Sequence, residues 1–164
     1  MIDLIEFEGD KYPSFQAEGN ASQFAIPFAK KFCKGLGVDI GFCKEEWKFP
    51  GAIGVDLDTY WTAYHLPAEL DYIYSSHCLE HLEGWVEAIE YWSTRLVLGG
   101  ILFLYLPHKD QKYWNPWNNR KHLHVLDADS VKSCMIKFGF KNILHSERDL
   151  NHSFMIVGEK DGGA

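Results

Sequence analysis

Gly35-Leu-Gly-Val-Asp-Ile-Gly-Phe-Cys43 is followed, after a short link, by Gly51-Ala-Ile-Gly-Val-Asp-Leu-Asp58. The first stretch predicts an apolar strand over 36–40 with a tight turn at Gly41. The second predicts another strand over 52–57, which closes on Asp56. A glycine turn lets backbone N–H groups approach a ligand, and an acid after the next parallel strand can accept both hydroxyls of a ribose. The pattern therefore predicts half of a nucleotide site before any catalytic residue is identified.

Strands and helices alternate along the rest of the chain. We expect helices over 22–33, 78–96 and 127–138, and strands over 70–74, 101–106, 140–145 and 153–158, between an irregular arm at 1–19 and a frayed tail at 159–164. The last two strands are joined by a short loop, which favours an antiparallel pair. The segment 41–51 is close to the minimum length for a crossover, so any helix in it is a turn or two that ends at Pro50. This alternation predicts an α/β fold with a mostly parallel sheet.

The bulk composition fits one domain over residues 1–164. A net charge of −7 disfavours broad binding to nucleic acid or to anionic membranes. No apolar run approaches the roughly 20 residues that a membrane-spanning helix needs. The four cysteines form no Cys-x-x-Cys pair, which suits a reducing, cytoplasmic location and gives no zinc framework.

Four motifs occur in a characteristic order: Val38-Asp-Ile-Gly-Phe-Cys43, Gly54-Val-Asp56, Leu70-Asp-Tyr-Ile-Tyr-Ser-Ser-His-Cys-Leu-Glu-His-Leu82, and Leu98-Gly-Gly-Ile-Leu-Phe-Leu-Tyr-Leu-Pro107. Over roughly residues 20–158 this order resembles the class I S-adenosylmethionine-dependent methyltransferases. A subgroup with a very short first crossover, mostly of unassigned substrate, is the most similar. The resemblance implies a Rossmann-like, doubly wound sheet with a C-terminal antiparallel hairpin. It also implies methyl transfer from S-adenosylmethionine to a small-molecule or peripheral acceptor.

The chain departs from the family's first motif, Asp/Glu-x-Gly-x-Gly-x-Gly, at its second and third glycines. Cys43 and Glu45 stand there instead, and a glutamate beside the cofactor carboxylate would repel it. The segment between Asp58 and Leu70, which in the family carries the adenine-binding residue, is compressed. These departures favour one alternative function, a catalytically inactive methyltransferase-like binding module.

The resemblance places the cofactor at the ends of the first, second and fourth strands. Asp39 is expected to hold a loop N–H or a water near the cofactor amine, although it would otherwise simply cap a turn. Asp56 is expected to hold the ribose. The predicted cofactor-binding residues are Asp39, Gly41, Phe42, Cys43, Asp56, Leu57, His65, Leu66, Ser75 and Ser76. The N-terminal arm, with Tyr12, Phe15 and Gln16, is expected to cover the cofactor.

The loop over 107–125 is long and crowded with His, Trp and Asn, and such loops tend to be functional. In the resembled fold it covers the substrate. His108 follows the fifth strand directly and is the predicted general base, with His77 as a second catalytic candidate. The predicted substrate-binding residues are Trp114, Trp117, Asn118, Arg120 and His122. The competing interpretation is that the tryptophans only pack the loop.

Three other function classes are weaker. A dinucleotide-dependent oxidoreductase needs a richer glycine turn that feeds a full helix. Nucleic-acid binding through Lys109, Lys112, Arg120 and Lys121 is opposed by the acidic chain. His77 and His81 have the spacing of metal ligands on one helix face, but without a nearby third ligand of known geometry we expect no metal site. A metal-dependent hydrolase built from the loop histidines is the remaining alternative. A small-molecule partner is expected, and the oligomeric state is left open.

Overall fold

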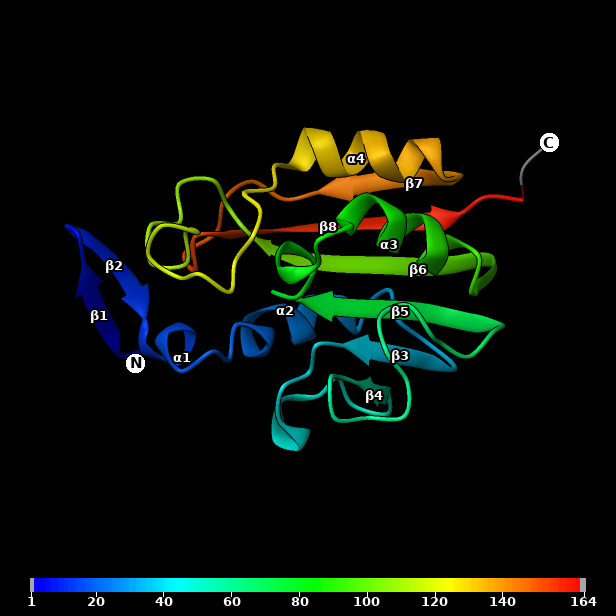
Figure 1. The fold of residues 1–164 in the computed structure, drawn as a ribbon, viewed down its shortest axis with the longest axis horizontal. Coiled ribbons are helices and arrows are strands. Elements are labelled where there is room, and N and C mark those ends of the chain that lie inside the picture. The colour runs from blue at the N-terminus through cyan, green and yellow to red at the C-terminus, as the bar shows by residue number, and fades with distance from the viewer. Residues whose placement is uncertain (1, 163–164) are drawn as a thin grey trace.

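The computed structural model describes residues 2–162, and its centre is a six-stranded mixed sheet (Figure 1). The strand order is β4-β3-β5-β6-β8-β7. The strands are β3 (Gly37–Ile40), β4 (Ile53–Val55), β5 (Leu70–Ser76), β6 (Leu96–Pro107), β7 (Phe140–His145) and β8 (Ser153–Lys160). The first four are mutually parallel, and β8 runs antiparallel to both β6 and β7. The predicted Rossmann-like sheet with a C-terminal hairpin is therefore confirmed.

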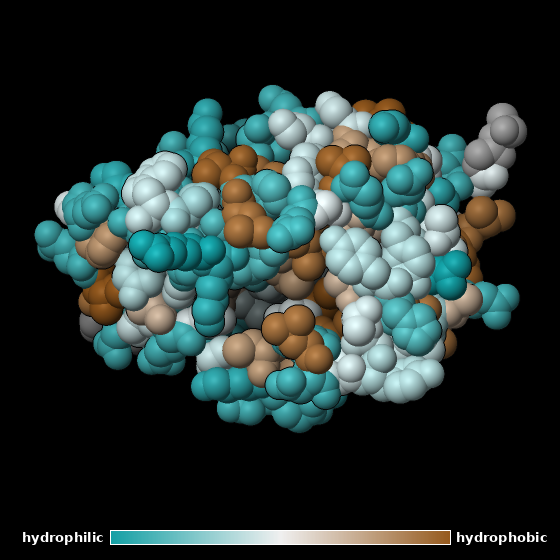
Figure 2. Space-filling view, viewed as in Figure 1, coloured by the Kyte–Doolittle hydropathy of each residue, from teal (hydrophilic) through white to brown (hydrophobic). Residues whose placement is uncertain are grey.

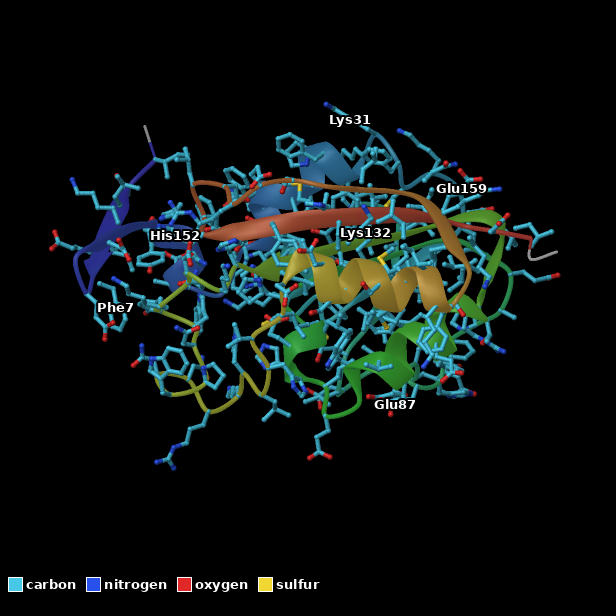
Figure 3. The ribbon with its side chains drawn as sticks, turned by 90° about the horizontal axis from the view of Figure 1, so that it is seen from above. Phe7, Lys31, Glu87, Lys132, His152 and Glu159 are labelled. Carbon is cyan, nitrogen blue, oxygen red and sulfur yellow. The ribbon has the colours of Figure 1, made fainter. Side chains whose placement is uncertain are left out.

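Helices cover both faces of the sheet, as the view from above shows (Figure 3). One face carries α3 (Trp85–Ser93) and α4 (Ala128–Lys137), and the other carries α2 (Ser22–Ala29). The apolar core is correspondingly divided in two. Trp92 and Ile89 of α3 belong to one cluster, and Tyr74 and Phe103 pack with α2 in the other. Because β5 and β6 are buried on both sides, they are continuous apolar runs without alternation.

The N-terminal arm is not irregular, which corrects the sequence prediction. Strands β1 (Leu4–Phe7) and β2 (Asp10–Pro13) form a hairpin, and a single turn of helix, α1 (Ser14–Ala17), follows. Glu8 and Gly9 both have positive φ, which is the backbone of a tight two-residue hairpin turn. The hairpin lies beside the 107–125 loop, where Tyr12 Oη accepts a hydrogen bond from Lys112 N at 3.3 Å (Figure 1).

Two predicted helices and one strand differ most from their expected bounds, and the other elements differ by at most three residues. The helix expected over 78–96 is a 3₁₀ turn, η2 (Leu79–His81), followed by α3, because the backbone is extended at Leu82 and a new helix begins after Gly84. The helix expected over 22–33 ends at Ala29. The strand expected over 101–106 runs from Leu96 to Pro107, with a register shift against β5 where Gly99 takes a φ of +78°.

The short first crossover is confirmed as a single 3₁₀ turn, η1 (Glu45–Trp47). Of the tail expected over 159–164, residues 159–160 belong to β8, and 163–164 lie outside the described residues. Within residues 2–162, every helix is too short or too polar to cross a bilayer.

Candidate active site

A cavity of about 650 Å³ opens at the carboxyl edge of the parallel strands, where Figure 2 shows the surface hollowed. Its size lies within the roughly 300–1,000 Å³ of small-molecule sites, and this edge is where open α/β sheets bind their ligands. The walls come from the ends of β3, β4 and β5, the N-terminal segment, the η2 turn and the 107–125 loop. Lining residues from these walls include Gln16, Gly41, Asp56, Ser76, His81 and Trp114.

Asp56 joins the first two strands at this cavity. Its Oδ2 accepts a hydrogen bond from Cys43 N at 2.9 Å, and its Oδ1 accepts one from Leu57 N at 2.7 Å. Each carboxylate oxygen has a second lone pair, so the group can accept further hydrogen bonds. Gly41 lies next to this pair, with a φ of +82°, and a Cβ built on it would stand 2.5 Å from Cys78 Cβ. Only glycine fits this turn.

Asp39 is not among the residues that line the cavity. It is 1% exposed, and its Oδ2 accepts a 2.7 Å hydrogen bond from Phe49 N. It therefore holds a loop N–H, as expected, in the crossover that leads to β4. Burial raises the pKa of its carboxyl to about 7, against the opposing effects of the Phe49 N–H and of Lys48.

Three histidines line one wall of the cavity, and a buried carboxylate lies behind them. Three ring nitrogens surround Oε1 of Glu80: Nδ1 of His77 and Nε2 of His81 lie at 3.9 Å, and Nδ1 of His122 lies at 3.8 Å. Glu80 is fully buried, and neither of its carboxylate oxygens has a hydrogen-bond partner. Burial raises the pKa of Glu80 to about 8, lowers the pKa values of His77 and His122 to about 3, and lowers that of His81.

The cavity brings together about half of the residues predicted to bind cofactor or substrate or to act in catalysis. Those that line it are Gly41, Cys43, Asp56, Leu57, Ser76, His77, Trp114 and His122. The others do not: Ser75 is buried and donates to Ile40 O at 3.0 Å, and Leu66 belongs to the core. Phe42 covers Gly54. His65 packs its ring against Trp61, with centroids 5.0 Å apart.

The predicted general base, His108, is outside the lining of the cavity. Its Nδ1 accepts a hydrogen bond from the backbone N–H of Asp110 at 3.2 Å. Its own backbone N–H donates a hydrogen bond to the carbonyl of His152 at 2.9 Å. Trp117, Asn118 and Arg120 are exposed and also lie outside the lining. Of the two predicted catalytic residues, His77 lines the cavity and His108 does not.

Sequence reasoning missed one group of lining residues and one buried residue behind the wall. The sequence indicates Gln16 only as part of a covering arm, yet its side-chain amide is 1% exposed and has no hydrogen-bond partner. Gly19 and Ala21, from the same segment, also line the cavity. Glu80 belongs to one of the family motifs without a predicted role, although its position three residues after His77 and directly before His81 pointed to a cluster.

The comparisons with known proteins agree with this geometry. A family model described as a methyltransferase domain matches residues 18–145. No curated protein matches the chain by sequence. Among solved structures, a possible histamine N-methyltransferase of Thermotoga maritima superposes with a TM-score of 0.68 at 16% identity, covering 90% of this chain and 93% of that one.

Two further structures show the same fold. A methyltransferase of Archaeoglobus fulgidus has a TM-score of 0.62 at 17% identity, covering 85% of this chain and 92% of its own. The N-methyltransferase NodS of Bradyrhizobium japonicum, in complex with S-adenosyl-L-homocysteine, has a TM-score of 0.62 at 12% identity, with 91% and 88% covered. Because the family model matches most of this chain, the chain belongs to the class I S-adenosylmethionine-dependent methyltransferases.

Proposed function

We propose that this chain binds S-adenosylmethionine in the cavity at the carboxyl edge of its sheet and transfers the methyl group to a small-molecule acceptor. The observation that carries the proposal is the position of Asp56. Its carboxylate lies on the cavity wall, fixed by two backbone N–H groups and with lone pairs free for the two hydroxyls of a ribose. Family membership supplies the reaction class.

The residues of the cavity fit this cofactor. The side-chain amide of Gln16 and the hydroxyl of Ser76 line the cavity and are buried without a hydrogen-bond partner. Buried polar groups of this kind are normally paired, so a polar ligand is the natural partner for both. The Gly41 turn leaves backbone close to the cavity without an intervening side chain.

The departures from the first motif do not support the inactive alternative. Cys43 takes the left-handed backbone conformation, φ 62°, which a glycine at this position would favour, and its N–H still holds Asp56. The Glu45 side chain is exposed, pairs with Lys48 and lies outside the lining of the cavity. Neither residue closes the site.

The cofactor supplies an activated methyl group on a sulfonium, which is already a good leaving group. The chain therefore has to align the acceptor with that methyl and exclude water. Trp114 offers an aromatic wall, and its ring stacks on His122 with centroids 5.5 Å apart and planes 10° apart. His77 keeps a neutral imidazole because burial lowers its pKa to about 3, so it is a weak base. An acceptor that enters as a free amine or another neutral nucleophile suits this site best.

Calorimetric titration with S-adenosylmethionine, S-adenosylhomocysteine and NAD tests the proposal. Saturable binding of both sulfur ligands at one per chain, with no heat from NAD, is the expected result. A panel of small amines, with S-adenosylhomocysteine production as the readout, then tests turnover. A chain that binds neither sulfur ligand refutes the proposal. If the chain binds both sulfur ligands but methylates no acceptor class, the alternative of a catalytically inactive binding module is supported instead.

A further inference from the structure

We propose that Glu80, His81 and His122 bind one divalent transition-metal ion beside the cavity, which the two histidines line. The side chains come from two segments, the η2 turn after β5 and the loop before α4, which Figure 1 draws next to each other. Their ligand atoms all lie within 4.8 Å of one another. This inference replaces the expectation from the sequence that the chain has no metal site.

The environment of the Glu80 carboxylate favours a bound ion. It is fully buried, and both of its oxygens lack a hydrogen-bond partner. A charged carboxylate is costly when buried and isolated, so in folded proteins such a group is protonated, paired or bound to a metal. The ring nitrogens around Oε1 stand at 3.8–3.9 Å, which is too far for a hydrogen bond. One ion between these atoms would satisfy the carboxylate and both imidazoles.

The distances suit an ion after a small contraction. Zinc bonds to nitrogen and oxygen are about 2.0–2.2 Å, which in tetrahedral geometry separates two ligand atoms by about 3.3 Å. The 3.8 Å between His122 Nδ1 and Glu80 Oε1, and the 3.9 Å to His81 Nε2, exceed this value by about half an ångström. The third pair, the ligand nitrogens of His81 and His122, lies within 4.8 Å, so ion binding requires the two imidazoles to approach each other as well.

The surroundings hold the ligands as metal sites do. His81 Nδ1 lies 2.7 Å from the carbonyl of Lys121, so Nδ1–H donates and the lone pair of Nε2 faces Glu80. Metal-binding histidines are usually oriented by such a bond from their other nitrogen. The Glu80 carbonyl accepts hydrogen bonds from Leu123 N at 2.9 Å and His124 N at 3.2 Å, which fixes the two ligand-bearing segments together.

The donor set selects the class of metal. Two imidazoles and one carboxylate favour borderline ions such as Zn²⁺ over Mg²⁺ or Ca²⁺, which prefer oxygen ligands. Three protein ligands leave a coordination position open. Because His81 and His122 line the cavity, that position faces the bound molecule, and an oxygen or nitrogen of the acceptor is the ligand it would take.

Zinc titration of the chain without cofactor tests the inference. The protein is prepared without a histidine tag, stripped with a chelator and titrated with Zn²⁺ in competition with a chromophoric chelator. We expect one equivalent per chain with a dissociation constant below about 1 μM. Substituted Co²⁺ should show visible absorption bands of nitrogen ligation.

Three variants and one control variant test which residues bind Zn²⁺. Glu80→Gln, His81→Ala and His122→Ala should each weaken Zn²⁺ binding more than about 100-fold, since even residues that only orient ligands cost 10–100-fold. His145→Ala removes an exposed histidine of β7 and should bind as the parent does. Circular dichroism checks each fold. Should Glu80→Gln fail to fold, His81→Ala decides, because the His81 side chain is 32% exposed.

The inference is overturned if the stripped chain takes up less than one equivalent of Zn²⁺, or if the folded ligand variants bind it as the parent does. It stands apart from the proposed methyl transfer. A chain that binds Zn²⁺ but no S-adenosylmethionine refutes the function and leaves the metal site. The reverse result refutes the metal site alone.

Discussion

The backbone N–H of Cys43 donates a 2.9 Å hydrogen bond to Oδ2 of Asp56, so the turn after β3 and the end of β4 form one unit. This contact explains how a chain that lacks two motif glycines keeps a cofactor turn. The carboxylate is aimed by the same backbone that a bound molecule would approach. Binding at this edge of the sheet should therefore depend on the acid more than on the missing glycines.

Asp56→Ala should weaken S-adenosylmethionine binding by about 10- to 100-fold. This range equals about 1.4–2.8 kcal/mol, the worth of about one hydrogen bond from a ligand hydroxyl to a charged acceptor. Calorimetry measures the change. Asp58→Ala is the matched control, because Asp58 is an exposed acid two residues away and lies outside the lining of the cavity. Equal affinity in the two variants would remove the ribose assignment.

The strands around Asp56 and the acid itself could be predicted from the sequence because each depends on local pattern. Continuous apolar runs identify buried strands such as β5, and a glycine followed by a strand-ending acid identifies the turn. The long-range contacts could not be predicted in this way. Glu80 and His122 lie far apart in the sequence, and the loop that brings them together has no periodicity to reveal its conformation.

The N-terminal hairpin illustrates the same limit. Its strands have four residues each, and their sequences show no clear alternation of apolar and polar residues. The sequence pattern alone therefore indicates an irregular arm. It makes long-range contacts with the 107–125 loop: Lys112 Nζ pairs with Asp10 at 2.9 Å, and Phe7 packs edge-on to Tyr113 at 5.0 Å. Since Gln16 follows this hairpin, the same long-range packing decides one wall of the cavity.

Cys43 should be the thiol that N-ethylmaleimide modifies first, and bound S-adenosylhomocysteine should slow that reaction. It is exposed and lines the cavity, whereas Cys33 and Cys134 are buried. Peptide mass spectrometry over time gives the site and the rate. An unchanged rate at saturating S-adenosylhomocysteine would place the ligand elsewhere.

Cys43→Gly should keep cofactor affinity and leave the free energy of unfolding unchanged or higher by up to about 1 kcal/mol. The φ of 62° is strained for any residue with a Cβ and free of strain for glycine. Cys43→Val places a β-branched residue in the same conformation and should lose more than about 1 kcal/mol. Urea unfolding compares the three chains. A valine variant as stable as the parent would show that the backbone strain is absent.

Gln16→Leu should separate binding from stability. The amide of Gln16 is buried without a partner, so its replacement removes a desolvation cost and should leave stability equal or higher. The same change should weaken S-adenosylmethionine binding at least several-fold, because the ligand loses a polar partner. Gln23→Leu, at an exposed position of α2, is the control and should leave affinity unaltered. Loss of stability with full affinity would assign Gln16 a structural role instead.

Asp39→Asn should flatten the pH dependence of stability. In the folded chain burial raises the pKa of Asp39 from 3.8 to about 7, so the folded state keeps a proton that the unfolded chain releases above pH 4. The free energy of unfolding therefore falls as pH rises from about 4 to about 7, and it levels off above that range. Asparagine keeps an oxygen that can accept from Phe49 N and has no proton to release.

The informative quantity is the difference in unfolding free energy between the parent and Asp39→Asn, measured in urea at several pH values. Glu80, Asp149 and the other titrating groups are common to both chains and largely cancel. The parent should lose a few kcal/mol relative to the variant between pH 4 and pH 7, because each tenfold change in a proton-binding constant is worth about 1.36 kcal/mol. A difference that stays constant, or that favours the parent as pH rises, would mean that Asp39 is ionised in the folded chain. The carboxylate would then fix the first crossover as a charged acceptor for the Phe49 N–H.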